Sequence, residues 1–441
     1  MVNENRFASG PAIVAYIAAL EFPIHLPNPG GYGFFTDELY FMACGEHLSF
    51  GYVDMPPLTA LQAWAARGLF GDSLLAIRLF PAIASAGLVV LTGALVRQLG
   101  GGRFAQALAA VAVLLAPFYL TVGSYLSMNS IEPLLWMGCA LVLIRMIQTG
   151  NGKLWLWFGL LAGIGLENKD TMLVFGLALV AGLAITAERR LMANRWFLFG
   201  GLAALVIFLP NLIWMIQHHF PHLEMLANIK RSGRNVAFNP LQFFGWQVLG
   251  MQPAAFPIWI CGLWYFLLSE PGRPYRALGW AYVLALIILL LAGGRFYYLA
   301  PAYPMLLASG AVAIETWLAP ARWLWLRWAY TGLLAVAGGV TALLALPLLP
   351  PETHVRFARF MGFSAPRFEH RQASELPQML ADRMGWPEMA AAAARVYYSL
   401  PADERARAAI FGINYGEAGA IDFYGPRLGL PKAISGHVNY W

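Results

Sequence analysis

Residues 36–58 read TDELYFMACGEHLSFGYVDMPPL, a polar and aromatic stretch between two apolar runs at 8–27 and 74–97. Each run is long enough to cross the roughly 30 Å hydrocarbon core of a bilayer as a helix. The first crossing ends, and the second begins, at the same face of the membrane. We therefore expect the loop at 28–73 to lie at one membrane surface, with a structure of its own.

The start of this stretch favours a short helix from about residue 37 to residue 48. Thr36 suits the N-cap position, and Asp37 and Glu38 fall in the first turn, where the helix dipole favours negative charge. Acidic residues are common at helix starts for this reason alone. Taken singly, these two carboxylates are therefore either capping charges on a solvated loop or functional groups.

A second helix is predicted from residue 57 to about residue 70, because proline is well suited to the first turn of a helix. Asp54 then lies in the turn between the two helices. An Asp before a proline-rich segment is also an ordinary turn residue. The arrangement nevertheless allows Asp37 and Asp54 to converge at the membrane edge.

The composition of the whole chain agrees with a membrane protein. Of its 441 residues, 59% are hydrophobic and 12% are charged, against about 25% charged residues in an ordinary soluble domain. The 29 Lys and Arg are scattered singly, which argues against a nucleic-acid partner. The three cysteines are far apart, so we expect no disulfide framework and no zinc site.

Apolar segments recur along the first 350 residues and predict about eleven transmembrane helices. Lys and Arg are about twice as frequent in the loops on the N-terminal side, which predicts a cytoplasmic N-terminus. The expected segments are 8–27, 74–97, 104–121, 131–148, 154–166, 170–187, 196–217, 246–268, 277–292, 297–318 and 323–349.

The segment after residue 350 is more polar and contains no spanning run. A helix is expected at 388–398 and a short apolar strand at 408–413. We therefore predict two domains: a transmembrane domain at 1–350 and a small extracytoplasmic α/β domain at 351–441.

The stretch at 36–58 resembles the signature of family 39 glycosyltransferases, the protein-mannosyltransferase-like membrane enzymes with the GT-C fold. It is most similar to the bacterial lipopolysaccharide aminoarabinosyl and galacturonosyl transferases. Two further stretches carry the likeness, GGRFYYLAPAYP at 293–304 and NYGEAGAIDFYGPRLGLPKAISGHVNYW at 414–441. The resemblance implies a polyprenyl-phosphate sugar donor, no organic cofactor, and inverting transfer to an extracytoplasmic acceptor. The acceptor would be a glycolipid such as lipopolysaccharide, another glycan or a protein.

The resemblance also implies roles for residues of the first loop. Asp37 matches the general base, or the group that orients the attacking hydroxyl, and we predict Glu38 beside it as a second catalytic carboxylate. Tyr52 and Asp54 match donor-binding positions, and the Asp54 position binds a divalent metal ion in some relatives. Met55 departs from the lysine that meets the donor phosphate in the aminoarabinose type.

The reaction also requires cations, since negative charge builds on the leaving phosphate. Arg295 and Tyr298 match the basic residue and the donor-binding tyrosine of the family. Lys169, in LENKDT, is a further phosphate candidate, or else balances a neighbouring acid. The sequence also contains a basic cluster at Lys230, Arg231 and Arg234. This cluster either contacts an anion or is solvated.

Together these features predict an all-α polytopic membrane protein of GT-C type with a small α/β domain. We expect it in the bacterial inner membrane, with the active site and the C-terminal domain outside the cytoplasm. The alternative is a transporter or flippase of lipid-linked sugars, and an inactive scaffold is a third reading. Transporters commonly show paired internal repeats, and the sequence shows no repeat of fixed period.

Overall fold

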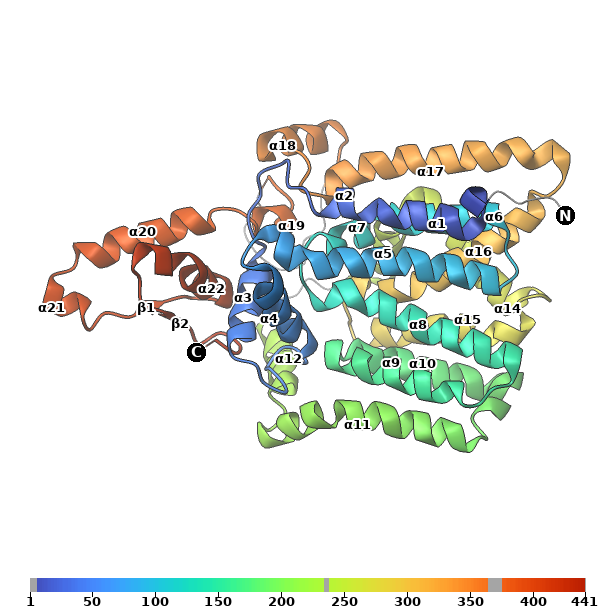
Figure 1. Ribbon diagram of the computed structural model, residues 1–441, viewed down its shortest axis with the longest axis horizontal. Helices are drawn as coiled ribbons and strands as arrows, with labels where there is room; N and C mark the ends of the chain where they lie inside the picture. Colours follow the sequence, from blue (N-terminus) through green and yellow to red (C-terminus); the bar gives the residue numbers. More distant parts are fainter. Residues whose placement is uncertain (1–5, 234–237, 364–374, 441) are drawn as a thin grey trace.

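The computed structural model describes residues 6–233, 238–363 and 375–440. Most of these residues are helical, and the long helices lie side by side in one body (Figure 1). The first half of the chain contributes α1 (Gly10–Ala19), α2 (Glu21–His25), α3 (Thr36–Glu46), α4 (Leu58–Phe70), α5 (Leu74–Gln98), α6 (Arg103–Leu114), α7 (Pro117–Gly123), α8 (Met128–Thr149), α9 (Leu154–Asn168), α10 (Thr171–Ala184) and α11 (Arg195–Gln217).

The second half completes this body and adds a C-terminal region. Its transmembrane part and connecting helices are α12 (Pro221–Ser232), α13 (Pro240–Gly250), α14 (Phe256–Leu268), α15 (Arg276–Leu291), α16 (Tyr303–Trp317) and α17 (Leu324–Ala345). The C-terminal elements are α18 (Pro351–Phe360), α19 (Gln378–Ala381), α20 (Trp386–Ser399), α21 (Ala402–Arg405), β1 (Ile410–Phe411), α22 (Tyr415–Tyr424) and β2 (Ala433–Ile434).

The described residues contain six helices that are long and apolar enough to cross a membrane, or up to eight if two bent pairs are single spans. The bends are 61° between α6 and α7 and 94° between α13 and the segment that contains α14. Three further apolar helices, Gly10–His25, α9 and α10, are shorter. The expected eleven spans are therefore not confirmed, because apolar runs in the sequence do not reveal where a helix breaks or bends.

Two long helices, α11 and α17, show most directly that the body is built for lipid. Only 11% of the most apolar window of each helix is buried inside the protein. Leu198 on α11 and Trp328 and Val336 on α17 are at least 70% exposed. Apolar surface of this extent is unfavourable in water and is typical of helices that face acyl chains. The protein is a multi-pass membrane protein.

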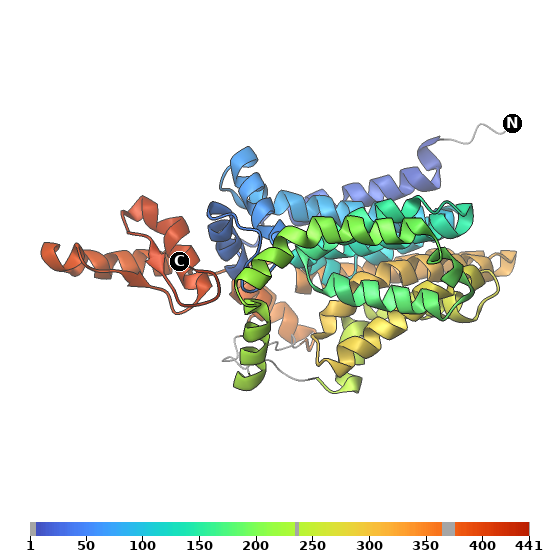
Figure 2. The ribbon, with the colours of Figure 1, turned by 90° about the horizontal axis from the view of Figure 1, so that it is seen from below.

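The described N-terminal residues and the C-terminal helices lie at opposite ends of the molecule (Figure 1). Helices α3, α4 and α12 lie across one end of the long helices, and α20 to α22 project beyond them (Figure 2). Helices α18 and α19 lie at the same end, against the body. A domain boundary at residue 350 stays a prediction.

The C-terminal region is mainly helical. Helix α20 includes the whole helix expected at 388–398. The strand expected at 408–413 shortens to β1, which pairs in parallel with β2 through two residues of each strand. An α/β domain is therefore not confirmed, since so small a sheet does not form a layer of its own.

Candidate active site

Helix α3 begins at Thr36 and is preceded by Phe35, whose backbone is extended with φ −70° and ψ 147°. The expectation that Thr36 is the N-cap is therefore wrong by one residue. The Glu38 carboxylate supplies the missing cap, because it accepts a hydrogen bond from the Phe35 backbone N–H at 2.8 Å. This geometry turns Asp37 and Glu38 toward different surroundings.

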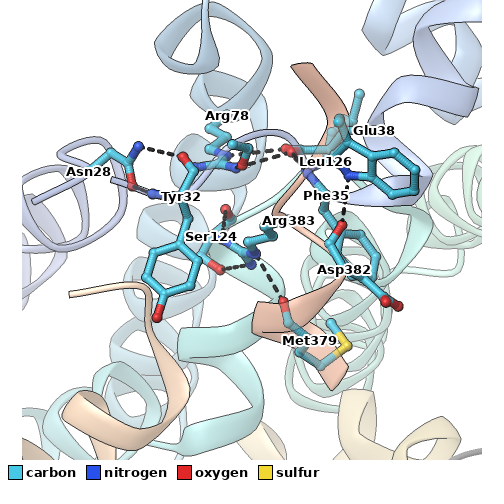
Figure 3. A network of polar contacts seen from close by, with 12 residues as sticks. Asn28, Tyr32, Phe35, Glu38, Arg78, Ser124, Leu126, Met379, Asp382 and Arg383 are labelled. Carbon is cyan, nitrogen blue, oxygen red and sulfur yellow. Dashed lines mark hydrogen bonds and ion pairs between the residues drawn. The ribbon is translucent and has the colours of Figure 1, made fainter. Parts of the chain in front are cut away.

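Glu38 is fully buried and belongs to a network of polar contacts (Figure 3). Its carboxylate forms an ion pair with the guanidinium of Arg78 on α5, with N to O distances of 3.1 and 3.2 Å. It also accepts a hydrogen bond from the Leu126 backbone N–H at 3.0 Å. With the bond from Phe35, four N–H donors surround this carboxylate. We predicted Glu38 to be catalytic, and the structure places it where it joins α3 to the helical body.

Arg383, between α19 and α20, extends this network to the C-terminal region (Figure 3). Its guanidinium donates to the Ser124 hydroxyl at 2.8 Å and to the Met379 carbonyl at 3.1 Å. Burial, aided by the positive charge of Arg78, lowers the pKa of Arg383 to about 9. Its backbone carbonyl accepts a hydrogen bond from Gly33. The loop before α3 is thus held by Arg383 of the C-terminal region, while α3 itself is held by Arg78 of the helical body.

Asp37 lies on the other face of α3 and is partly exposed. Its Oδ1 accepts a hydrogen bond from the Tyr415 hydroxyl at 2.8 Å. Burial raises the pKa of Asp37 to about 6, and the negative charges of Asp54 and Asp382 act in the same direction. The bond from Tyr415 and the positive charge of Arg295 lower this pKa in part. A carboxyl group with a pKa near neutrality is well matched to general-base catalysis.

Asp54 lies in the turn between α3 and α4, as predicted, and its charge interacts with that of Asp37. Its Oδ1 accepts a hydrogen bond from the Tyr40 hydroxyl at 2.7 Å. Burial raises the pKa of Asp54, and the Tyr40 bond and the nearby His222 oppose the shift. The two acids therefore converge, as expected from the helix–turn–helix pattern.

His222 on α12 connects this loop to the break between α9 and α10. Its Nδ1 is 3.2 Å from the Val53 carbonyl oxygen, and its Nε2 is 3.1 Å from Oδ2 of Asp170. The loop that carries Asp54 is thus held by a residue from a distant helix. The same helix carries two residues of the predicted basic cluster, Lys230 and Arg231, and both are exposed. The third residue of that cluster, Arg234, lies outside the described residues.

The basic side of the site comes from the segment before α16. Arg295 donates to the Tyr297 hydroxyl at 3.1 Å, and its charge acts on Asp37. The Lys169 ammonium is 4.5 Å from the ring centre of Tyr298 and donates to Glu132 at 2.8 Å. The charge of Arg295 therefore acts on Asp37, whereas Lys169 contacts Tyr298 and has its own charge balanced by Glu132.

Tyr52, predicted to contact the donor, is 1% exposed. Its hydroxyl lies 3.1 Å from each of the Cys44 and His47 carbonyl oxygens and accepts a hydrogen bond from the Ser49 N–H. These contacts fix the turn that follows α3. The side chain of Tyr52 is therefore buried within the loop and does not lie at its surface.

The predicted metal position at Asp54 can be tested against its neighbours. No group of three or more His, Cys, Asp or Glu side chains within 6–233, 238–363 and 375–440 is arranged to hold a metal ion. Asp54 has Tyr40 as its hydrogen-bond partner and His222 nearby. Within the described residues, Asp54 is therefore not part of a cluster of metal-binding side chains.

Three residues of the site were not predicted from the sequence: Tyr415, Tyr40 and His222. The sequence does carry a local signal for the first. Asn414 caps α22 by accepting hydrogen bonds from the Gly416 and Glu417 N–H groups, and Glu417 reaches back to the Ile413 N–H at 2.8 Å. This N-cap pattern is visible as NYGE, and it places Tyr415 in the first helical turn. The sequence does not show that the hydrogen-bond partner of Tyr415 is Asp37.

The fold resembles those of solved membrane enzymes. The structures of ArnT from Cupriavidus metallidurans, bound to undecaprenyl phosphate and in the apo state, match with TM-scores of 0.59 and 0.61 at 15% identity, over 96% of this chain and 84% of theirs. The oligosaccharyltransferase of Archaeoglobus fulgidus matches with a TM-score of 0.52 at 12% identity, over 92% of this chain and 60% of that one. Among curated proteins, no sequence matches significantly.

These likenesses define a polytopic membrane protein with the GT-C fold. Residues 54–214 match the family model described as dolichyl-phosphate-mannose-protein mannosyltransferase. The resemblance to family 39 glycosyltransferases is therefore confirmed over these residues.

Proposed function

We propose that this protein is a glycosyltransferase that moves a sugar from a polyprenyl-phosphate donor to a hydroxyl group of an extracytoplasmic acceptor. One observation carries the proposal: a partly exposed carboxyl group, Asp37, accepts a hydrogen bond from Tyr415 and lies near enough to the cationic side chain of Arg295 for that charge to act on it, while burial raises its pKa to about 6. The solved ArnT structure of similar fold holds undecaprenyl phosphate, which supports a donor of this class.

The chemistry follows from the two sides of the site. The acceptor oxygen attacks the anomeric carbon and its proton passes to Asp37. The bond from that carbon to the phosphate oxygen breaks, and polyprenyl phosphate leaves with the electron pair. Arg295, whose charge acts on Asp37, would stabilise the phosphate charge. Lys169, which is bound to Glu132, is proposed for the same role. A single displacement of this kind inverts the anomeric configuration.

The location and partners of the enzyme belong to the same proposal. The protein would lie in the bacterial inner membrane, with its N-terminus in the cytoplasm and the site at the outer face. The donor's isoprenoid tail would lie in the bilayer, and the acceptor would be a glycolipid such as lipopolysaccharide, another glycan or a protein. A divalent metal ion at Asp54 remains part of the hypothesis to be tested.

The experiment measures polyprenyl-phosphate release by purified protein from a labelled mixture of bacterial polyprenyl-phosphate sugars, with a mixture of envelope acceptors. Asp37→Asn should reduce release by about 10²–10⁴-fold, because the base is lost. Asp72→Asn is the matched control, since Asp72 is in the same loop but pairs with Arg67 on the surface. Release that is unchanged in Asp37→Asn, or absent for every donor with folded wild type, would contradict the proposal. An arm with EDTA tests the metal.

A further inference from the structure

The hydrogen bond on the proposed base comes from the far end of the chain. Tyr415 lies 378 residues after Asp37, on α22, and its hydroxyl is 2.8 Å from Oδ1. Because a hydroxyl donates and a carboxylate accepts, this bond fixes one of the two Asp37 oxygens. The other oxygen, Oδ2, is then the one oriented to receive a proton.

Tyr415 is itself held firmly. Its backbone N–H donates to Nδ1 of His437 at 3.4 Å, and its ring stacks on the His437 ring with 5.0 Å between centres. Its ring also contacts that of Tyr40 at 4.7 Å, and Tyr40 is the residue that donates to Asp54. The rings of Tyr415 and Tyr40 thus connect the two acids.

The C-terminal region also holds the second acidic segment directly. The side-chain oxygen of Asn439 accepts a hydrogen bond from the backbone N–H of Val53, next to Asp54. Tyr415 and Asn439 therefore contact the loop at Asp37 and next to Asp54, the two acids of the candidate site.

We propose that Tyr415 is a positioning residue for Asp37, so that the C-terminal region completes the active site. This inference rests on the proposed function, since it concerns the orientation and basicity of the same carboxylate. It adds a role for a region that lies beyond the long helices and supplies a hydroxyl group to the site.

The role predicts a specific pH effect. The charged groups around Asp37 are Asp54, Asp382 and Arg295, and the hydrogen bond from Tyr415 opposes the rise in the pKa of Asp37 that burial causes. Tyr415→Phe removes only the hydroxyl, so this pKa should rise further. Since the base must be deprotonated, the acidic limb of the pH profile of kcat/KM should move upward by about one pH unit.

The test compares the pH profiles of kcat/KM for wild type, Tyr415→Phe and Tyr398→Phe in the full-length protein. Tyr398 is the matched control, because its exposed hydroxyl donates to the Gly429 carbonyl within the C-terminal region. The acidic limb should move only in Tyr415→Phe. Coincident profiles for all three proteins would overturn the inference while leaving the transferase activity established.

A second variant tests the same hydrogen bond without removing the hydroxyl, so that misfolding does not explain its effect. Replacing Tyr415 with 3-fluorotyrosine keeps the ring and makes the hydroxyl a stronger donor, so the acidic limb should move to lower pH. A limb that stays in place would contradict the inference. Wild-type protein that is folded but inactive with every donor would instead refute the proposed function itself.

Discussion

Asp37 and Glu38 are consecutive residues of α3, and their carboxylates meet different surroundings. Glu38 is fully buried and receives four N–H donors, two of them from Arg78. Asp37 is partly exposed and accepts a bond from the hydroxyl of Tyr415. A charge that is fully compensated stabilises the fold, whereas a carboxyl group with a raised pKa is suited to proton transfer.

Glu38→Gln should destabilise the protein strongly. The substitution leaves the buried guanidinium of Arg78 without its compensating charge, which costs about 3–5 kcal/mol for a buried pair. The temperature of unfolding in detergent should fall well below that of wild type.

Two control variants are compared with Glu38→Gln in the same unfolding measurement. Glu46→Gln alters a surface carboxylate that pairs with Arg67 and Lys432, and should change stability by no more than about 1 kcal/mol. Asp37→Asn should unfold near the wild-type temperature although it is inactive. A Glu38→Gln protein as stable as wild type would contradict a structural role for Glu38.

At the scale of elements, the decisive contact is that of α22 with α3. A Cβ atom at Gly416 would overlap the hydroxyl of Thr36, and one at Gly419 would lie 3.1 Å from the backbone of Leu39. The two helices therefore approach through glycines. This approach lets the Tyr415 hydroxyl reach Asp37.

Gly419→Val should push α22 away from α3 and lengthen the distance from Tyr415 to Asp37. Transfer should fall at least tenfold, because a displacement of about 1 Å at a reacting group has effects of this size or larger. Gly68→Val on α4 is the control, since nothing lies within 4 Å of a Cβ atom there. Equal rates for the two variants would show that close packing of α22 is not required.

Local patterns predicted several elements of the first loop. Helix α4 spans Leu58–Phe70, so its predicted end is confirmed, and its start lies one residue after the predicted one because Pro57 is the N-cap. Helix α3 is within about two residues of its expected bounds. The start of α3 was wrong by one residue because Glu38, not Thr36, caps it. Capping depends on where the chain enters the helix, and the pattern of residue types does not show that.

Contacts between distant segments could not be predicted in the same way. The convergence of Asp37 and Asp54 follows from one turn, but the bond from Tyr415 depends on how the C-terminal region folds back over the loop. The structural positions of Glu38 and Tyr52 likewise depend on partners that sequence spacing does not identify. The number of spans was not confirmed for a different reason, because apolar runs do not show where a helix breaks or bends.

At the scale of the whole molecule, the orientation in the membrane is testable. Ala402 on α21 and Ala187 in the connection from α10 to α11 are exposed. Helix α21 and that connection lie toward opposite ends of the molecule (Figure 1). With the N-terminus in the cytoplasm, a membrane-impermeant maleimide should label Ala402→Cys in intact spheroplasts and Ala187→Cys only after lysis.

The native cysteines favour this measurement. Cys44 and Cys139 are buried, and Cys261 lies within α14. Wild-type protein therefore serves as the unlabelled control. Labelling of Ala187→Cys before lysis, with Ala402→Cys protected, would reverse the proposed orientation.

The separation of 378 positions between Asp37 and Tyr415 also determines when each residue is made during synthesis. At about 5–20 residues per second, synthesis of the intervening chain takes on the order of 20–75 s. During this interval the first loop already lies outside the membrane, if the proposed orientation holds, while the hydroxyl that orients Asp37 has not been made. The nascent protein would thus pass through membrane insertion with an incomplete site, and its activity would begin only when the C-terminal region has crossed the bilayer and folded onto the loop.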